Sequence, residues 1–188
     1  KAFDGFRETS PYYLGKMDLW YGFACHGIDF LQPRGLLCFI AQNNWTTSAG
    51  AKKMRNKVIK DTQILQLLDF NTYMVFENAD IQTMIMLFRH NQSIAKYCFD
   101  YRIITQGNEK DDMLALLNKR QRNTKFLNLS INRKSLYDKL LTFSDDNQIF
   151  EKIEKNKTYL KDEEVAQGIV FPQDYLNKQG AERLGNRF

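Results

Sequence analysis

The sequence predicts an α/β fold that is organised around residues 35–88. Three short apolar runs bounded by polar turns, residues 36–41, 64–70 and 75–88, lack the alternation of a half-exposed strand. We therefore expect three strands that are buried on both faces. The segment between the first two runs, residues 48–60, has its apolar side chains at helical spacing. A strand, a helix and a strand within about thirty residues predict a parallel crossover unit of right-handed sense.

The third run follows its predecessor closely, so we expect these two strands to pair antiparallel. This arrangement forms the closing edge of an α/β sheet, and three strands are a fragment of something larger. An uncovered strand edge tends to pair with another edge, so self-association through an open sheet edge is expected. The first residue is Lys1, and we expect the chain to be a piece of a longer product.

The bulk composition is that of a packed globular protein. Of the 188 residues, 43% are hydrophobic and 13% are aromatic, which excludes a disordered tail. No apolar run approaches the length of a membrane span, and no signal peptide is visible. Cys25, Cys38 and Cys98 form no disulfide or zinc pattern, which favours a reducing, cytoplasmic setting. His26 and His90 have no companions at ligand spacing, so we expect no metal site.

The formal net charge of +5 permits a polyanionic partner without requiring one. Residues 1–100 hold 11 basic and 9 acidic residues, and residues 101–188 hold 16 and 13, so neither half is strongly basic. Any nucleic-acid surface must therefore be local, and the best candidate is the predicted helix at residues 48–60. Its cations are Lys52, Lys53, Arg55, Lys57 and Lys60. The charge suggests phosphate contacts for Lys52, Lys53 and Arg55; the alternative is that these cations form the solvated outer face of a helix.

Residues 16–31 predict a helix that is apolar nearly all round, as expected of a helix packed against a sheet. The first strand follows, and a polar loop with Asn43, Asn44 and Trp45 comes after it. Loops at the carboxyl ends of parallel strands hold the ligand sites of open α/β sheets. The same residues could form only a turn into a helix capped by Ser48, and both interpretations can hold together.

The connecting loop at residues 70–79 carries Tyr73, Val75 and Phe76. An exposed aromatic side chain beside a sheet edge can stack on a nucleic-acid base. The alternative is that Phe76 plugs the end of the sheet, which is a common role for a loop phenylalanine.

The carboxyl-terminal part predicts mainly helices and connecting segments. An edge strand at residues 99–105 precedes a helix at residues 111–122, which begins with acids and ends with bases. Residues 123–141 are irregular and polar and predict a short strand and a connector. Ser144 caps a second amphipathic helix, and a charged linker leads to a new element at Val165.

This pattern divides the chain into three parts. Residues 1–105 form the sheet with its helices, and residues 106–164 form a helical connector. Residues 165–188 are the truncated start of a second domain.

Four segments resemble the motifs of one enzyme family. Residues 15–20 (Gly-Lys-Met-Asp-Leu-Trp) resemble its Gly-Lys-x-Asp-Leu-Tyr helix start, and residues 31–45 resemble its Leu-Lys-Pro-Gly-Gly strand and Asn-Ser-Trp loop. Residues 68–83 resemble its motif VIII, and residues 165–170 (Val-Ala-Gln-Gly-Ile-Val) resemble the Gln-Gly-Ile-x-Thr-Gly start of its target recognition domain. The family is the gamma-class adenine-N6 DNA methyltransferases of restriction–modification systems, in particular the large bifunctional type IIG enzymes. Arg34 departs from it by replacing a common glycine, and Phe-Pro replaces the usual Thr-Gly in the last motif.

The resemblance implies part of a Rossmann-like methyltransferase sheet, with closing strands and crossover helices, followed by the helical connector. It implies transfer of a methyl group from S-adenosylmethionine to N6 of an adenine that is flipped out of double-stranded DNA. The main cofactor-binding loop and the Asn/Asp-Pro-Pro-Tyr/Phe tetrapeptide of the family lie upstream. Residues 10–13 (Ser-Pro-Tyr-Tyr) are too close to residues 16–20 to be that tetrapeptide. No catalytic residue is therefore expected in this chain, which should be inactive alone.

The matched motifs also imply roles for single residues. Phe76 matches the motif VIII aromatic that stacks on the extruded adenine, and Asp18 and Leu19 match the helix start that flanks the cofactor pocket. The loop at the mouth of the target-base pocket is matched by Asn43, Asn44 and Trp45. The alternative function is a non-catalytic DNA-binding or assembly subunit with a methyltransferase-like fold. A third reading is an unrelated α/β domain whose loops match by chance.

Overall fold

The fold was obtained as a computed structural model that describes residues 5–79, 81–143, 152–153, 157–158 and 160–161. The chain divides into two compact units, residues 1–147 and residues 148–188. All helices and strands discussed below lie in the first unit. The helix expected from Ser144 and the charged linker lie almost entirely outside the described residues, and the start of a second domain lies wholly outside them.

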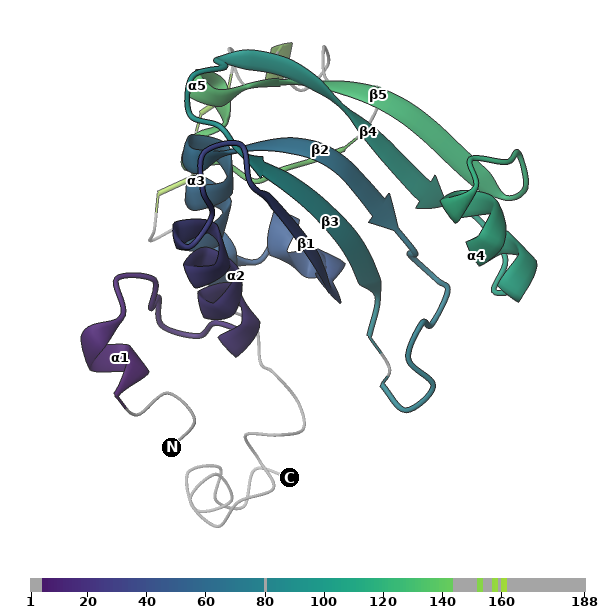
Figure 1. Cartoon of the computed structure of the whole chain (residues 1–188), viewed down its shortest axis with the longest axis horizontal. Helices are drawn as coiled ribbons and strands as arrows, with labels where there is room; N and C mark the ends of the chain where they lie inside the picture. Colours follow the sequence, from purple (N-terminus) through teal and green to yellow (C-terminus); the bar gives the residue numbers. More distant parts are fainter. Residues whose placement is uncertain (1–4, 80, 144–151, 154–156, 159, 162–188) are drawn as a thin grey trace. The chain divides into compact units, whose positions relative to one another are not determined.

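The described part of the chain is built on one open sheet of five strands in the order β1-β3-β2-β4-β5 (Figure 1). The strands are β1 (Leu36–Gln42), β2 (Thr62–Asp69), β3 (Thr83–His90), β4 (Lys96–Ile104) and β5 (Thr124–Asn132). β3 lies between β1 and β2 and pairs antiparallel with both, so β1 and β2 run in the same direction. β4 adds to β2 in parallel, and β5 adds to β4 antiparallel. The mixed α/β fold class, the crossover and the antiparallel third strand are thus confirmed.

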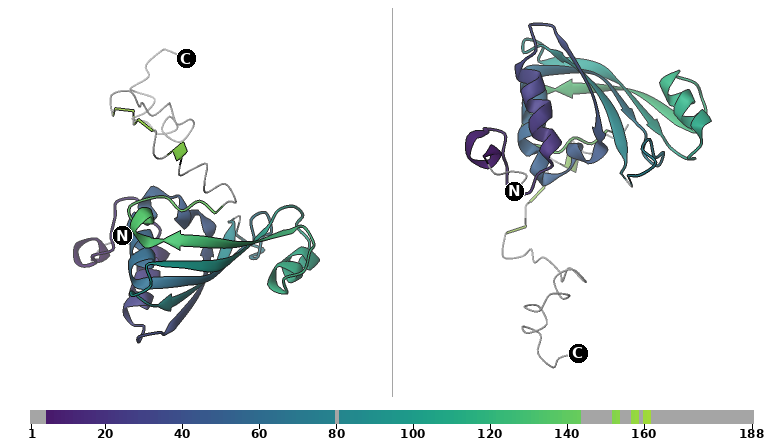
Figure 2. Two further views of the ribbon diagram at one scale, coloured as in Figure 1. Left: turned by 90° about the horizontal axis from the view of Figure 1, so that it is seen from above. Right: turned by 60° about the horizontal axis from the view of Figure 1, so that its bottom comes forward.

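Short helices connect these strands. They are α1 (Phe6–Thr9), α2 (Leu19–Asp29), α3 (Lys52–Asp61), α4 (Lys110–Leu117), α5 (Arg133–Leu136) and the 3-10 helices η1 (Asn43–Thr46) and η2 (Ala49–Ala51). α2 and α3 lie against one face of the sheet (Figure 1, Figure 2). The main core lies between these helices and that face. Among the described residues, no helix has the length and apolar character needed to cross a membrane.

A second, smaller core lies on the opposite face of the sheet, near the ends of β2 and β4. Its buried side chains are Leu68, Phe70, Ile104 and Leu116. Leu116 belongs to α4, so α4 covers this part of the opposite face. Four half-buried side chains pack against the same core: Tyr73, Val75, Ile85 and Met113.

β1 is not buried on both faces, contrary to our expectation. Leu36 and Ile40 are 55% and 42% exposed, and they alternate with the half-buried Leu37 and Phe39. The reason is that β1 lies at an edge of the described sheet and meets α2 on one face only. The exposed aliphatic residues of β1 therefore form an apolar surface. α2 is also apolar on its outer side, since Phe23 is 62% exposed.

The part of the chain expected to be a helical connector also contributes to the sheet. β5 begins at Thr124 and pairs with β4 along its whole length, from Thr124 opposite Ile104 to Asn132 opposite Lys96. The signal for this strand is present in the sequence, because three apolar residues alternate with polar ones: Leu127, Leu129 and Ile131. The helix α4 is shorter than the predicted 111–122, because the chain turns at Lys119, which has a φ of 55°.

Candidate functional site

Three loops lie at the same end of the sheet, because β1, β2 and β4 run in the same direction and all end there. β1 leads into η1, β2 leads into the loop of residues 70–82, and β4 leads into residues 105–109. Figure 1 shows the long β2–β3 loop and α4 at the same end of the sheet. The carboxyl ends of parallel strands are where open α/β sheets bind ligands.

The Asp69 carboxylate joins the first two of these loops. It is the last residue of β2 and is only 7% exposed. Its Oδ1 accepts hydrogen bonds from Asn43 Nδ2 at 3.0 Å and from the Asn71 backbone N–H at 2.9 Å. Its Oδ2 accepts a hydrogen bond from the Tyr101 hydroxyl of β4 at 3.2 Å. One side chain therefore connects η1, the start of the β2–β3 loop and β4.

Burial also sets the protonation chemistry of this group. Burial raises the pKa of Asp69 above its ordinary value, and the hydrogen bonds from Asn43, Asn71 and Tyr101 oppose the shift without cancelling it. The pKa of Tyr101 is raised as well, by burial and by the neighbouring Asp69. Asp69 lies within the motif at residues 68–83 but was not among the predicted site residues. An acid between apolar residues at the end of a strand was the available signal.

We expect Asp69→Asn to change how the stability of the chain depends on pH. A carboxyl group with a raised pKa stabilises the fold below its ordinary pKa, and this contribution is lost as the pH rises through the folded-state value. The difference in melting temperature, wild type minus variant, should therefore fall as the pH rises above about 4, the ordinary pKa of an aspartate side chain. Thermal unfolding of the 188-residue chain at several pH values measures it.

Asp100→Asn is the matched control for this experiment. Partial burial of Asp100 is outweighed by hydrogen bonds from Arg102 and Gln66, and its pKa is lowered. Its stabilising contribution is present above the ordinary pKa, so the same difference should rise with pH. Equal slopes for the two variants would contradict the environment that we describe for Asp69.

In the described part of the loop of residues 70–82, the apolar side chains are buried or half-buried except that of Phe76. Phe70 is buried, and Tyr73 and Val75 pack against the second core. Phe76 is 44% exposed. Phe70, Tyr73 and Val75 thus cover the end of the sheet, and the Phe76 ring remains accessible to solvent there.

The predicted loop Asn43–Trp45 lies at the same end of the sheet, but its three side chains differ in burial. Asn43 is half-buried and held by Asp69. Asn44 is exposed, and its Oδ1 accepts a hydrogen bond from the Tyr21 hydroxyl at 3.3 Å. Trp45 is fully buried, with its ring 6.1 Å from that of Phe88 in an edge-to-face arrangement.

The expectation that Trp45 forms the rim of a pocket is therefore corrected. The 3-10 turn of η1 directs the indole ring into the main core, on the face covered by the helices. The loops that carry Trp45 and Phe76 lie at the same end of the sheet, but the Trp45 ring is buried in the main core and the Phe76 ring is exposed.

The predicted pair Asp18 and Leu19 lies at the start of α2, close to the loops after β1. Asp18 is half-buried, and Leu19 is 38% exposed. The preceding backbone packs tightly on η2, because a Cβ atom placed on Gly50 would collide with the carbonyl oxygen of Lys16. The start of α2 and the loop after β1 therefore lie close together.

The three cations suggested for DNA phosphates also differ. Arg55 is 3% exposed. Its guanidinium donates to three backbone carbonyls, those of Trp45 at 2.8 Å, Ser48 at 2.5 Å and Lys139 at 3.2 Å. The phosphate role of Arg55 is therefore corrected, because it faces the core side of α3 and holds neighbouring segments together.

Lys52 and Lys53 are exposed and remain candidates for phosphate contacts. Lys52 lies 3.3 Å from the Asp138 carboxylate, and Lys53 donates a hydrogen bond to the Pro11 carbonyl at 2.7 Å. Both contacts are at the surface, where ion pairs contribute little and exchange readily.

One family model matches the amino-terminal part of this chain. Residues 4–76 match the family model described as the Eco57I restriction-modification methylase. The matched segment holds α2, β1, α3 and β2, and it ends at Phe76. A search of curated proteins found no match.

Two solved structures resemble this chain in fold. The type IIG restriction endonuclease BpuSI is 13% identical with a TM-score of 0.48, over 71% of this chain and 17% of that protein. The methyltransferase subunit of a type I restriction-modification system from Streptococcus thermophilus is 14% identical with a TM-score of 0.44, over 67% of this chain and 31% of that subunit. This chain thus spans less than a third of either protein.

Proposed function

We propose that this chain is part of a site-specific DNA methyltransferase that transfers a methyl group from S-adenosylmethionine to N6 of a flipped adenine. The observation that carries the proposal is the exposed Phe76 ring on a loop whose other described aromatic and aliphatic residues are buried or half-buried. The match of residues 4–76 to a methylase family supports it. Enzymes that modify a base in duplex DNA extrude that base and stack it on aromatic or apolar side chains.

In this proposal, the part played by the chain is to hold the target base. The Phe76 ring receives one face of the extruded adenine, and such stacking is worth about 1–3 kcal/mol per base. Asn43 lies on the neighbouring loop, where Asp69 fixes its amide. Much of the rate enhancement of such a reaction comes from positioning, which requires these loops to be rigid.

The cofactor site is only partly represented. S-adenosylmethionine supplies an activated methyl group when it is bound. Asp18 and Leu19 lie at the start of α2, where Asp18 is half-buried and Leu19 is 38% exposed. A small ligand can therefore reach Leu19, and the two residues fit the flank of such a site. Its main binding loop is expected outside this chain.

The test is methylation of duplex DNA by the full-length protein that contains this chain. Nucleoside mass spectrometry should find N6-methyladenine when S-adenosylmethionine is supplied, and the 188-residue chain alone should give none. Methylated cytosine as the sole product would refute the adenine assignment. Binding to DNA with no methylation by the full-length protein would favour a non-catalytic DNA-binding subunit.

The same preparation of the isolated chain tests the open sheet edge. β1 pairs only with β3 among the described residues, and its outer face is apolar. We propose that the isolated chain self-associates through this edge. Sedimentation of a compact monomer at high concentration would argue against it.

A further inference from the structure

The β2–β3 loop is fastened to the segment that follows β4. Asn71 Nδ2 donates to the Ile104 carbonyl at 2.9 Å, and Thr72 Oγ1 donates to the Gly107 carbonyl at 3.0 Å. The backbone N–H of Met74 lies 3.4 Å from its acceptor on the Asn108 side chain. These contacts follow one another along both segments. The position of the loop that carries Phe76 therefore depends on the position of residues 104–108.

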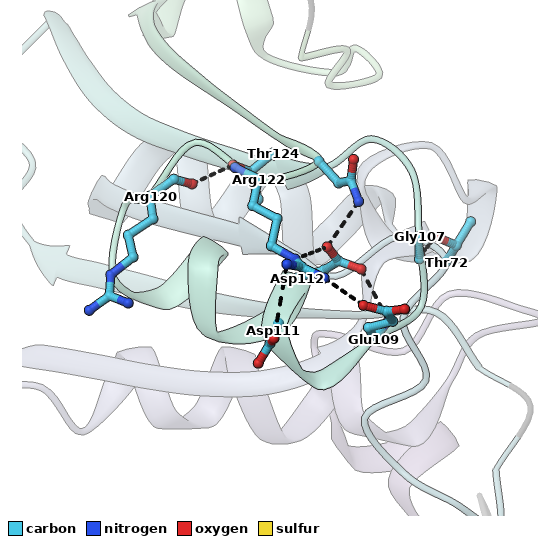
Figure 3. Close-up of polar contacts among 9 residues, drawn as sticks. Thr72, Gly107, Glu109, Asp111, Asp112, Arg120, Arg122 and Thr124 are labelled. Atoms are coloured by element: carbon cyan, nitrogen blue, oxygen red, sulfur yellow. Dashed lines mark hydrogen bonds and ion pairs between the residues drawn. The ribbon is translucent and has the colours of Figure 1, made fainter.

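The segment after β4 is in turn held by a polar cluster that we call the Arg122 clamp. It consists of Glu109, Asp112 and Arg122 (Figure 3), together with Asn123. Asp112 is 1% exposed and accepts hydrogen bonds from Arg122 Nε at 3.1 Å and Asn123 Nδ2 at 3.0 Å. It also accepts from the Glu109 backbone N–H at 3.1 Å, and Glu109 pairs with Arg122 at 2.5 Å.

Gly107 connects the clamp to the loop. Its φ of 85° is in the left-handed region, which glycine adopts without steric cost. A Cβ atom at this position would collide with the Asp112 carboxylate. Gly107 therefore packs directly on the clamp with one side and accepts the Thr72 hydrogen bond with its carbonyl.

The clamp rests on a fixed base. α4 is tied to β4 at its carboxyl end, because Arg102 Nη1 donates to the carbonyls of Leu116 at 3.2 Å and Leu117 at 3.0 Å. Leu116 is fully buried in the second core. By contrast, Arg122 and Glu109 are largely exposed, with side chains 46% and 71% accessible. The clamp can thus be weakened without opening a hydrophobic core.

We propose that Arg122 and Thr72 are positioning residues for the target base, because the clamp and the Thr72 hydrogen bond hold the β2–β3 loop where Phe76 receives that base. The proposal rests on the proposed function and adds to it Thr72, within the matched segment 4–76, and the Arg122 clamp, outside that segment. Neither residue needs to touch DNA or the cofactor for this role.

The experiment compares Thr72→Val and Arg122→Gln in the full-length protein. A DNA duplex with 2-aminopurine at the target position reports extrusion and stacking of the base by its fluorescence. One hydrogen bond is worth about a five-fold change in an equilibrium, so we expect the fluorescence response and kcat to fall about five-fold for Thr72→Val. The KM for DNA and the melting temperature should change little, which separates positioning from a general structural defect.

Matched controls are available within the chain. Thr72→Ser keeps the hydroxyl group and should behave as the wild type. Arg120→Gln makes the same charge change in the same turn, but the Arg120 side chain points away from the clamp (Figure 3). Arg120→Gln should therefore leave the fluorescence response unchanged.

The outcomes separate this inference from the proposed function. If Phe76→Ala lowers the response while Thr72→Val and Arg122→Gln do not, the positioning role is refuted and the proposed function stands. If Phe76→Ala has no effect, the proposed function fails, and this inference fails with it. Should Arg122→Gln not fold, the comparison of Thr72→Val with Thr72→Ser decides the question.

Discussion

Phe76→Ala in the full-length protein is expected to lower kcat/KM for DNA methylation about ten- to hundred-fold. Stacking of a base on an aromatic ring contributes about 1–3 kcal/mol, and each 1.4 kcal/mol corresponds to about a factor of ten. The ring is 44% exposed and lies outside both hydrophobic cores, so the melting temperature should change little. Methylation kinetics and 2-aminopurine fluorescence provide the measurement.

Two control variants sharpen this experiment. Phe76→Tyr keeps an aromatic face and should retain most of the activity. Tyr73→Ala removes a side chain that packs against the second core, so it should lower stability instead. Wild-type methylation and wild-type base exposure in Phe76→Ala would remove Phe76 from the site.

Arg55→Met is expected to destabilise the fold by about 2–6 kcal/mol, because it removes one buried hydrogen bond, at about 1–3 kcal/mol, and two partly buried ones, at about 0.5–1.5 kcal/mol each. The affected carbonyls belong to Trp45, Ser48 and Lys139. The methionine side chain can replace part of the packing but none of the hydrogen bonds. Urea or thermal unfolding of the chain measures the loss.

Lys53→Met is the control, since it removes an exposed cation from the same turn of the same helix. It should change the free energy of unfolding by no more than about 0.5 kcal/mol. If Lys53 contacts a phosphate, this variant should instead weaken DNA binding and reduce its salt dependence by about one charge. A stable Arg55→Met variant with weakened DNA binding would reverse our assignment of Arg55.

The order of elements up to β3 was predictable because it depends on local patterns. Apolar runs at β1 and β2, helical spacing between them and a closely following third run indicate the crossover and the antiparallel strand. β5 was expected only as a short strand inside a connector, because its alternation of Leu127, Leu129 and Ile131 lies in a mostly polar segment. Its nine-residue pairing with β4 is a long-range contact that local patterns do not specify.

The same distinction between local patterns and long-range contacts applies to the candidate site. The presence of a loop with Phe76 after a buried strand, and its resemblance to a methylase motif, can be inferred from the sequence alone, because motif spacing and residue type are local properties. Which side chains face solvent and which face the core depends on how the strands and helices pack against one another. Trp45 and Arg55 are buried, whereas Phe76 is exposed, because Phe70, Tyr73 and Val75 already fill the end of the sheet. The links through Asp69 and the Arg122 clamp join residues that are far apart in the chain, and such contacts exist only once the strands have paired.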